Sequence, residues 1–225
     1  MDFRGKIIKS THVFFRSGFL YKIALEASNK VENEPEQALV SLIFSYNSLE
    51  AFINETAMSC EIFSGGRRTD KERDFYDLIN QMQDDQVSTA EKYHTAKEHF
   101  TDKRWDKGGK VFQNFTLLTL LRNELIHRKS EVVKQKKVIG GEKSEIDLCS
   151  IRNKLYSRLK DKKLVTNIDP TADESWIDSV QNPQFAKWCC ETALDMTTEF
   201  FSYLPEGHFK HKMMEQMSFQ PYVNG

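Results

Sequence analysis

The sequence contains few of the residues that interrupt helices. Its 225 residues include only 10 glycines and 5 prolines, the two residue types that most often break or end a regular helix. Hydrophobic residues make up 39% of the chain and charged residues 29%, a balance typical of ordinary folded proteins and not of collagen-like or disordered chains. The composition therefore predicts a folded, mainly helical protein.

Long apolar runs and paired cysteine motifs are also missing. The longest uncharged run covers residues 37–49, whereas a membrane-spanning helix needs about 20 apolar residues. The first residues lack the basic and then apolar order of a secretory signal. No Cys-x-x-Cys spacing occurs, which argues against a structural zinc site, and the cysteines are too few for a disulfide framework. They are Cys60, Cys149, Cys189 and Cys190. We expect a cytoplasmic protein without membrane contact, metal or other cofactor.

The formal net charge of −1 hides an uneven distribution along the chain. Residues 128–163 carry 12 basic and five acidic residues, a local charge of +7, so the remainder sums to −8. Such a segment attracts a phosphate backbone, although most charge runs simply face solvent, and both interpretations stay open. The nucleic-acid contacts expected on the first interpretation come from Arg128, Lys129, Lys134, Lys136 and Lys137.

Apolar residues recur every three or four positions along several segments, which predicts amphipathic helices. The expected helices cover residues 12–28, 35–63, 70–82, 89–100, 111–128 and 183–205, the second with Pro35 in its first turn. Caps at Thr69 and at Asn182, the latter followed by Pro183, mark two of the starts. The predicted fold is all-α, an antiparallel helical bundle of about five long helices with a small irregular insertion before the last helix.

The bundle is expected to form a single domain over residues 1–205. A basic insertion at 129–170 interrupts it, with a candidate hairpin around Gly140-Gly141 and a helix over 144–160. Residues 206–225 show no clear period and are expected to form a tail.

One acidic residue interrupts the apolar face of the second expected helix. Glu50 lies four residues after Tyr46 and three before Ile53, which both belong to that face. A buried carboxylate needs a partner, or its pKa rises. The alternative is a slightly rotated helix that leaves Glu50 half exposed.

Three polar residues end the apolar helix at 111–128. Helix geometry advances about 100° per residue, so Asn123 and His127 lie about 40° apart on one face, and the long side chain of Arg122 can reach the same cleft. Arginine offers a rigid fork to phosphate oxygens, and histidine can move a proton near neutral pH. This combination favours a site for a phosphodiester.

The segment Arg122-Asn123-Glu124-Leu125-Ile126-His127 resembles the Arg-Asn-x-x-x-His signature of the HEPN superfamily (higher eukaryotes and prokaryotes nucleotide-binding). Residues 45–55 are similar to the early helix of bacterial HEPN-like proteins, which carries an acidic residue on its inner face, a position that Glu50 matches. The helix around Lys187-Trp188 resembles the closing helix of the same group. The similarity extends over residues 11–205.

The resemblance implies a metal-independent endoribonuclease that acts as a homodimer with a composite cleft. It assigns proton transfer with the RNA 2′-hydroxyl to His127, charge neutralisation on the phosphorane to Arg122, orientation to Asn123, and pairing with Arg122 to Glu50. The products would be a 2′,3′-cyclic phosphate and a 5′-hydroxyl, which DNA cannot give. It also implies a toxin or phage-defence role, with RNA and an antitoxin protein as partners.

Two alternatives without catalysis stand beside this hypothesis, one purely structural and one a binding module. Arg122 and Glu50 could form a buried structural ion pair, with Asn123 and His127 merely satisfying the helix end. HEPN-like domains also include non-catalytic modules that bind RNA, nucleotides or proteins, and the motif by itself does not separate the two.

A ferritin-like di-metal bundle is a further alternative. Two Glu-x-x-His spacings occur, in Glu91-Lys92-Tyr93-His94 and in Glu124-Leu125-Ile126-His127. Such bundles add one glutamate from each of two other helices, for which Glu50 and Glu199 are the candidates. The first segment lies among charged residues that indicate a solvent-facing surface, which weakens this alternative.

Overall fold

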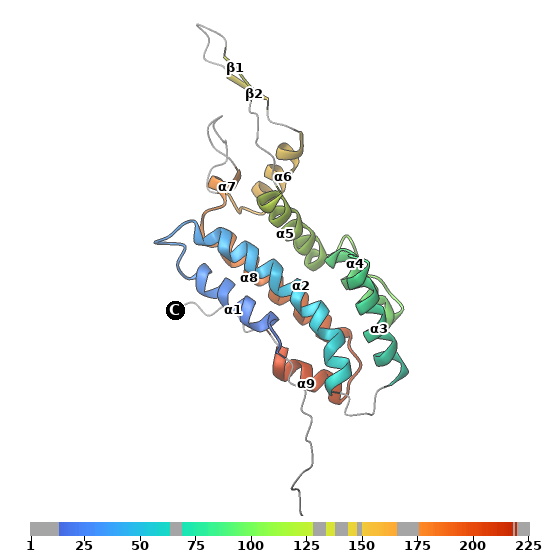
Figure 1. The fold of residues 1–225 in the computed structure, drawn as a ribbon. Coiled ribbons are helices and arrows are strands. Elements are labelled where there is room, and N and C mark those ends of the chain that lie inside the picture. The colour runs from blue at the N-terminus through green and yellow to red at the C-terminus, as the bar shows by residue number, and fades with distance from the viewer. Residues whose placement is uncertain are drawn as a thin grey trace, which may run out of the picture.

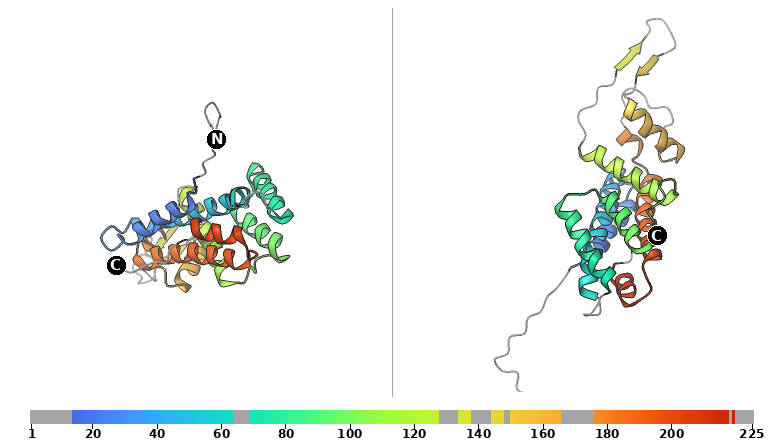
Figure 2. Two further views of the ribbon diagram at one scale, coloured as in Figure 1. Left: turned by 90° about the horizontal axis from the view of Figure 1, so that it is seen from below. Right: turned by 90° about the vertical axis from the view of Figure 1, so that its right-hand side faces the viewer.

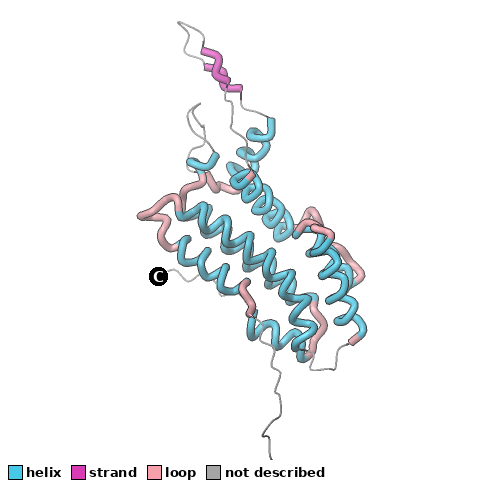
Figure 3. The backbone as a smooth tube through the Cα atoms, in the orientation of Figure 1, coloured by secondary structure: helices cyan, strands magenta, loops and turns pink. Residues whose placement is uncertain are grey.

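A computed structural model describes residues 14–63, 69–127, 134–137, 144–147, 150–165, 176–217 and 219. Within these ranges the chain forms nine helices and two strands: α1 (Ser17–Ser28), α2 (Gln37–Phe63), α3 (Asp70–Asp84), α4 (Thr89–Thr101), α5 (Lys110–Ile126), β1 (Lys134–Lys137), β2 (Ser144–Asp147), α6 (Ser150–Asp161), α7 (Trp176–Ser179), α8 (Pro183–Tyr203) and α9 (His208–Met217). Helices dominate (Figures 1 and 3), which confirms the all-α prediction.

The longest helix, α2, packs between α1 and α8. Ser41 Oγ donates to the carbonyl oxygen of Ala24 at 3.0 Å, and Glu55 accepts from the backbone of Arg16, so numbers rise along α2 as they fall along α1. These two helices are therefore antiparallel to each other.

The pair α2 and α8 does not follow the antiparallel expectation. Ser45 Oγ lies 3.8 Å from Cys190 Sγ, and the Phe52 and Phe200 rings are 5.2 Å apart, so residue numbers rise together along both helices. Because successive long helices alternate in direction, α8 runs the same way as α2 once α3, α4 and α5 have intervened. A repeat of apolar residues within one segment does not indicate which helices become neighbours in space.

Helices α3, α4 and α5 cover another side of α2 (Figure 1). Thr69 begins α3 with a reciprocal capping box to Glu72, which satisfies two backbone N–H groups that the helix itself cannot use. The rings of Phe75 and Phe100 join α3 to α4 at 4.8 Å, and Tyr93 joins α4 to Phe115 of α5 at 5.3 Å. Aromatic contacts thus link three successive helices into one body.

The C-terminal segment forms helix α9, although the sequence predicts no regular structure there. Met213 and Met217 of α9 are buried, as is the following Phe219. Ser59 Oγ of α2 lies 3.1 Å from Met217 Sδ. Burial against α2 therefore stabilises a helix whose own apolar pattern is weak.

The insertion contains the expected hairpin, with β1 antiparallel to β2. It stands at the end of the molecule where α6 and α7 lie, opposite α9 (Figures 1 and 2). The expected helix over 144–160 begins later than predicted, because residues 144–147 pair with β1 and α6 starts at Ser150. The hydroxyl of Tyr156 in α6 donates to Ser179 Oγ of α7 at 3.0 Å, which joins the two short helices.

A membrane span would need a long helix of mostly apolar residues, and the described part of the chain contains none.

Candidate functional site

The Arg-Asn-x-x-x-His segment lies at the C-terminal end of α5. The helix begins after Gly109 and ends at Ile126, and His127 is its C-cap, with its backbone N–H donating to the Asn123 carbonyl oxygen at 2.9 Å. The helix thus ends two residues before the predicted end at 128, and His127 lies just beyond it. The backbone hydrogen bond fixes His127 next to the last turn of α5.

Arg122 is half-buried and lies on an aromatic ring. Its guanidinium carbon is 4.9 Å from the centroid of the Tyr46 ring on α2, within the range of a cation–π interaction. Its Nη1 donates to Asn123 Oδ1 at 3.1 Å. Its Nε is buried and has no hydrogen-bond partner among the described residues. One amide and one ring face therefore hold the guanidinium, and most of its N–H groups stay available.

The predicted pairing of Glu50 with Arg122 is not formed. Among the described residues Glu50 and Arg122 make their contacts with other partners, although both act electrostatically on the pKa of Tyr46. Glu50 Oε1 instead accepts from Thr89 Oγ1 at 3.3 Å, and Thr89 Oγ1 lies 3.0 Å from the Tyr46 hydroxyl. Since a threonine hydroxyl has one proton to donate, Tyr46 is the donor to Thr89. Glu50 reaches Arg122 only through Thr89 and Tyr46.

Burial keeps the Tyr46 hydroxyl neutral. It raises the pKa of this group, the neighbouring Glu50 raises it further, and Thr89 and Arg122 oppose the shift. A neutral hydroxyl can keep donating to Thr89 across the ordinary pH range. The ring beneath Arg122 is thus tied at its far end by a hydrogen bond.

A buried lysine completes the polar cluster. Lys92 of α4 donates from Nζ to Asn54 Oδ1 at 2.9 Å and also to Gln83. Its burial lowers its pKa, and the nearby charge of Glu50 opposes that shift. Sequence reasoning missed Lys92, because the charged residues around it indicate a solvent-facing helix. Its spacing of three from Thr89 on one helix face was the available signal.

Asn123 and His127 lie at the surface. Both side chains are exposed, and so is the neighbouring Ile126, at 45%. The His127 ring makes no hydrogen bond to any residue that the structure describes. The structure therefore brings Arg122 and Asn123 into contact and leaves His127 accessible beside them, with Glu50 on the far side of Tyr46.

The candidate ligands of the di-metal alternative do not lie together. Among described residues, no group of three or more His, Cys, Asp and Glu side chains is placed to hold a metal ion. Glu91 pairs with Arg104, and Glu199 pairs with Lys97 at 3.2 Å. His94 is 4% exposed, which contradicts the expected solvent face. Three of the drafted ligands are thus committed to other contacts or to the core.

Only part of the expected basic surface can be placed. Arg128 and Lys129 lie outside the described residues. Lys134 and Lys136 of β1 stand directly opposite Asp147 and Glu145 of β2. Lys137 stands opposite Ser144.

Comparison with known proteins found no protein-family model, curated protein or solved structure that matches this chain. The site must therefore be interpreted from its own geometry.

Proposed function

We propose that the chain is a HEPN-like, metal-independent endoribonuclease that acts as a homodimer in the cytoplasm. The observation that carries this proposal is the uncompensated charge of Arg122 among the described residues. Its charge is not neutralised by a carboxylate among the described residues, and it lies beside the exposed Asn123 and His127. A cation and a titratable imidazole at one accessible helix end suit a phosphodiester.

The chemistry follows from these side chains. His127 takes the proton from the RNA 2′-hydroxyl, whose oxygen attacks the adjacent phosphorus. Arg122, with Asn123 beside it, stabilises the charge that develops on the phosphorane oxygens. The bond to the 5′-oxygen breaks, and this oxygen takes up a proton to leave as a hydroxyl. The other product is a 2′,3′-cyclic phosphate.

This scheme calls for a second copy of the chain. The reaction needs one group to accept a proton and another to donate one, whereas each chain presents one His127. The exposed Ile126 beside it offers an apolar contact for a partner helix. We therefore propose a composite cleft between two α5 ends. A toxin or phage-defence role, with an antitoxin protein as partner, is part of the same proposal.

A non-catalytic RNA-, nucleotide- or protein-binding module is the second candidate. The His127 ring makes no hydrogen bond within the described part of the chain, which favours this candidate, because catalytic histidines are usually oriented by a hydrogen bond to the second ring nitrogen. Salt-sensitive RNA binding without cleavage would support this candidate.

The decisive experiment is RNA cleavage in the presence of EDTA. We expect cleavage to a cyclic phosphate, lost by about 100-fold or more in Arg122→Ala and His127→Ala. The matched controls are Arg73→Ala and His211→Ala, which replace exposed residues of α3 and α9 and should cleave normally. An RNA with a single 2′-deoxy position should resist cleavage there. Intact RNA after prolonged incubation with micromolar folded protein would contradict the proposal.

A further inference from the structure

Arg122 and Lys97 both lie on aromatic rings, but their charges are compensated differently. Lys97 Nζ lies 4.5 Å from the Trp105 ring centroid and also pairs with Glu199 at 3.2 Å. Ring and carboxylate together compensate its charge. Arg122 has a ring at 4.9 Å and no carboxylate partner within the described part of the chain.

An aromatic face is well suited to orient an arginine that must act on a phosphate. The attraction acts through the plane of the guanidinium, so it does not occupy the N–H groups at the edge that would bind phosphate oxygens. A carboxylate in the same place would take up two of these N–H groups and cancel the charge. Tyr46 therefore holds Arg122 while leaving its charge for substrate.

The Tyr46 ring is itself held in place. The side chain is 6% exposed, and its hydroxyl is hydrogen-bonded to Thr89 Oγ1 at 3.0 Å, which in turn donates to Glu50 at 3.3 Å. Tyr46 belongs to α2, and Thr89 lies in the first turn of α4. The ring is therefore held by α2 and α4 where it contacts Arg122 of α5.

We infer that Tyr46 is a positioning residue for Arg122, and that Thr89 and Glu50 act by anchoring the Tyr46 ring. Glu50 thus serves the site without touching Arg122. This inference rests on the proposed ribonuclease function, because it concerns the orientation of Arg122 toward the scissile phosphate.

The test compares Tyr46→Leu with Tyr46→Phe. Phenylalanine keeps the ring and loses only the hydroxyl anchor to Thr89, so kcat for RNA cleavage should fall about threefold. Leucine removes it, so kcat should fall about tenfold, which corresponds to about 1.4 kcal/mol. The Arg122 interaction develops in the transition state, so KM should change less than about twofold. Wild-type kcat in folded Tyr46→Leu overturns the inference.

The matched control is Tyr21→Leu. Tyr21 is also buried, at 2% exposure, and its hydroxyl also makes one hydrogen bond, to the Cys190 carbonyl oxygen. It packs on Phe219 and not on Arg122. A loss of kcat in Tyr21→Leu equal to that in Tyr46→Leu would mean a general effect of a damaged core, which also overturns the inference.

A second readout does not require activity. In the NMR spectrum, the Arg122 Nε–H resonance, assigned by its loss in Arg122→Lys, should move when Tyr46→Leu removes the ring, and should not move in Tyr21→Leu. If wild-type protein leaves RNA intact but this shift is seen, the proposed function fails and the contact between ring and guanidinium stands. An unmoved resonance overturns the inference even if RNA is cleaved.

Glu50 provides variants in case Tyr46→Leu does not fold. Glu50→Gln keeps an oxygen that accepts the Thr89 hydroxyl, so kcat should equal that of wild type, whereas Glu50→Leu should lower it about threefold, as Tyr46→Phe does. Equal kcat values in the two variants overturn the anchoring role.

Discussion

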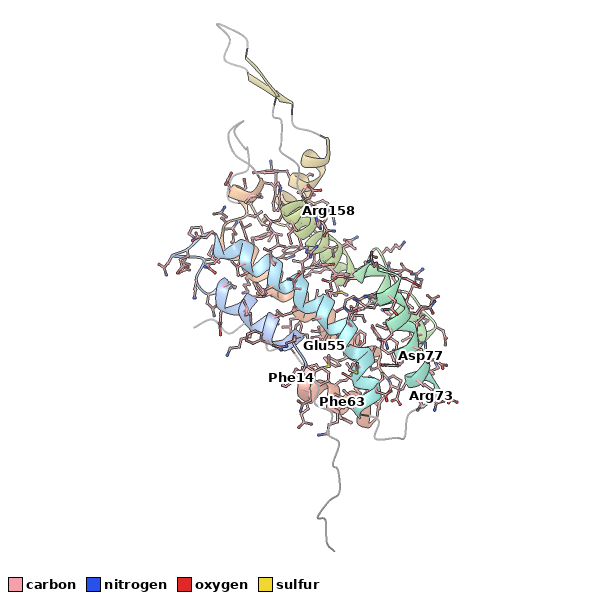
Figure 4. The ribbon with its side chains drawn as sticks, in the orientation of Figure 1. Phe14, Glu55, Phe63, Arg73, Asp77 and Arg158 are labelled. Carbon is pink, nitrogen blue, oxygen red and sulfur yellow. The ribbon has the colours of Figure 1, made fainter. Side chains whose placement is uncertain are left out.

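Glu55 caps the first helix from a distance, and its removal gives a sharp prediction. Its two carboxylate oxygens accept from the backbone N–H groups of Arg16 and Ser17 at the start of α1. Arg16, the residue just before the helix, makes no capping hydrogen bond with its own side chain. Figure 4 shows Glu55 on α2 beside Phe14, at the point where α1 begins. A residue 38 positions away in sequence therefore performs a task that is usually local.

The expected loss follows from what Glu55→Ala leaves behind. The N–H of Arg16 can turn to water because Arg16 is exposed, whereas Ser17 is fully buried. A hydrogen bond to a charged group contributes about 1.5–3 kcal/mol and a helix cap about 1 kcal/mol. We therefore expect Glu55→Ala to cost about 2 kcal/mol, or about 4–8 °C in Tm for a chain of this length.

The assay is thermal unfolding followed by circular dichroism, with amide hydrogen exchange to locate the change. Glu55→Gln, which keeps an accepting oxygen but loses the charge, should cost about half as much. The control is Glu26→Ala, which breaks an exposed pair with Lys22 on the same helix and should cost less than about 0.5 kcal/mol. Equal Tm values for Glu55→Ala and Glu26→Ala, or faster exchange elsewhere but not at the start of α1, would refute the reasoning.

Two further predictions concern the core. Phe52 is fully buried against the rings of Phe200, Phe201 and Phe219, so Phe52→Ala should cost about 3–5 kcal/mol in urea unfolding, and a loss below about 1 kcal/mol would contradict this packing. Burial lowers the pKa of His94, with Arg104 adding to the shift. The unfolded chain therefore binds a proton more readily than the folded one, so stability from this group is present above about pH 6.5 and is lost as the pH falls through the lowered folded-state pKa. Between about pH 7.5 and pH 5.5, Tm should fall less in His94→Phe than in wild type, and equal slopes would show that His94 is not responsible.

Helices whose signals are local could be predicted closely. The predicted end of the second helix at residue 63 coincides with the end of α2, which starts two residues after Pro35, and the caps at Thr69 and Asn182 lie where the structure has them. A cap acts through backbone groups within three residues, so the sequence around it contains the whole signal. Helix α9 was missed because its stability comes from Met213 and Met217 packing on other helices, which no local pattern reveals.

The candidate site shows the same division. Arg122, Asn123 and His127 could be selected because they interrupt an apolar helix at a spacing that places them near one another. The partner of Arg122 could not be selected, because a tyrosine at a helical apolar spacing indicates only a core position. Lys92 was hidden for the opposite reason, since charge in a helix usually indicates solvent.

The sequence by itself determined that the chain is helical, where most helices begin, and which helix end carries an arginine, an amide and an imidazole. These features depend on residues a few positions apart, within the reach of one helix turn. Only the tertiary structure decided that α2 and α8 run in the same direction, and that Glu50 anchors a tyrosine ring through Thr89 instead of pairing with Arg122. Such choices depend on which helix faces meet, and small differences in the rotation of a long helix change the neighbours of every side chain on it.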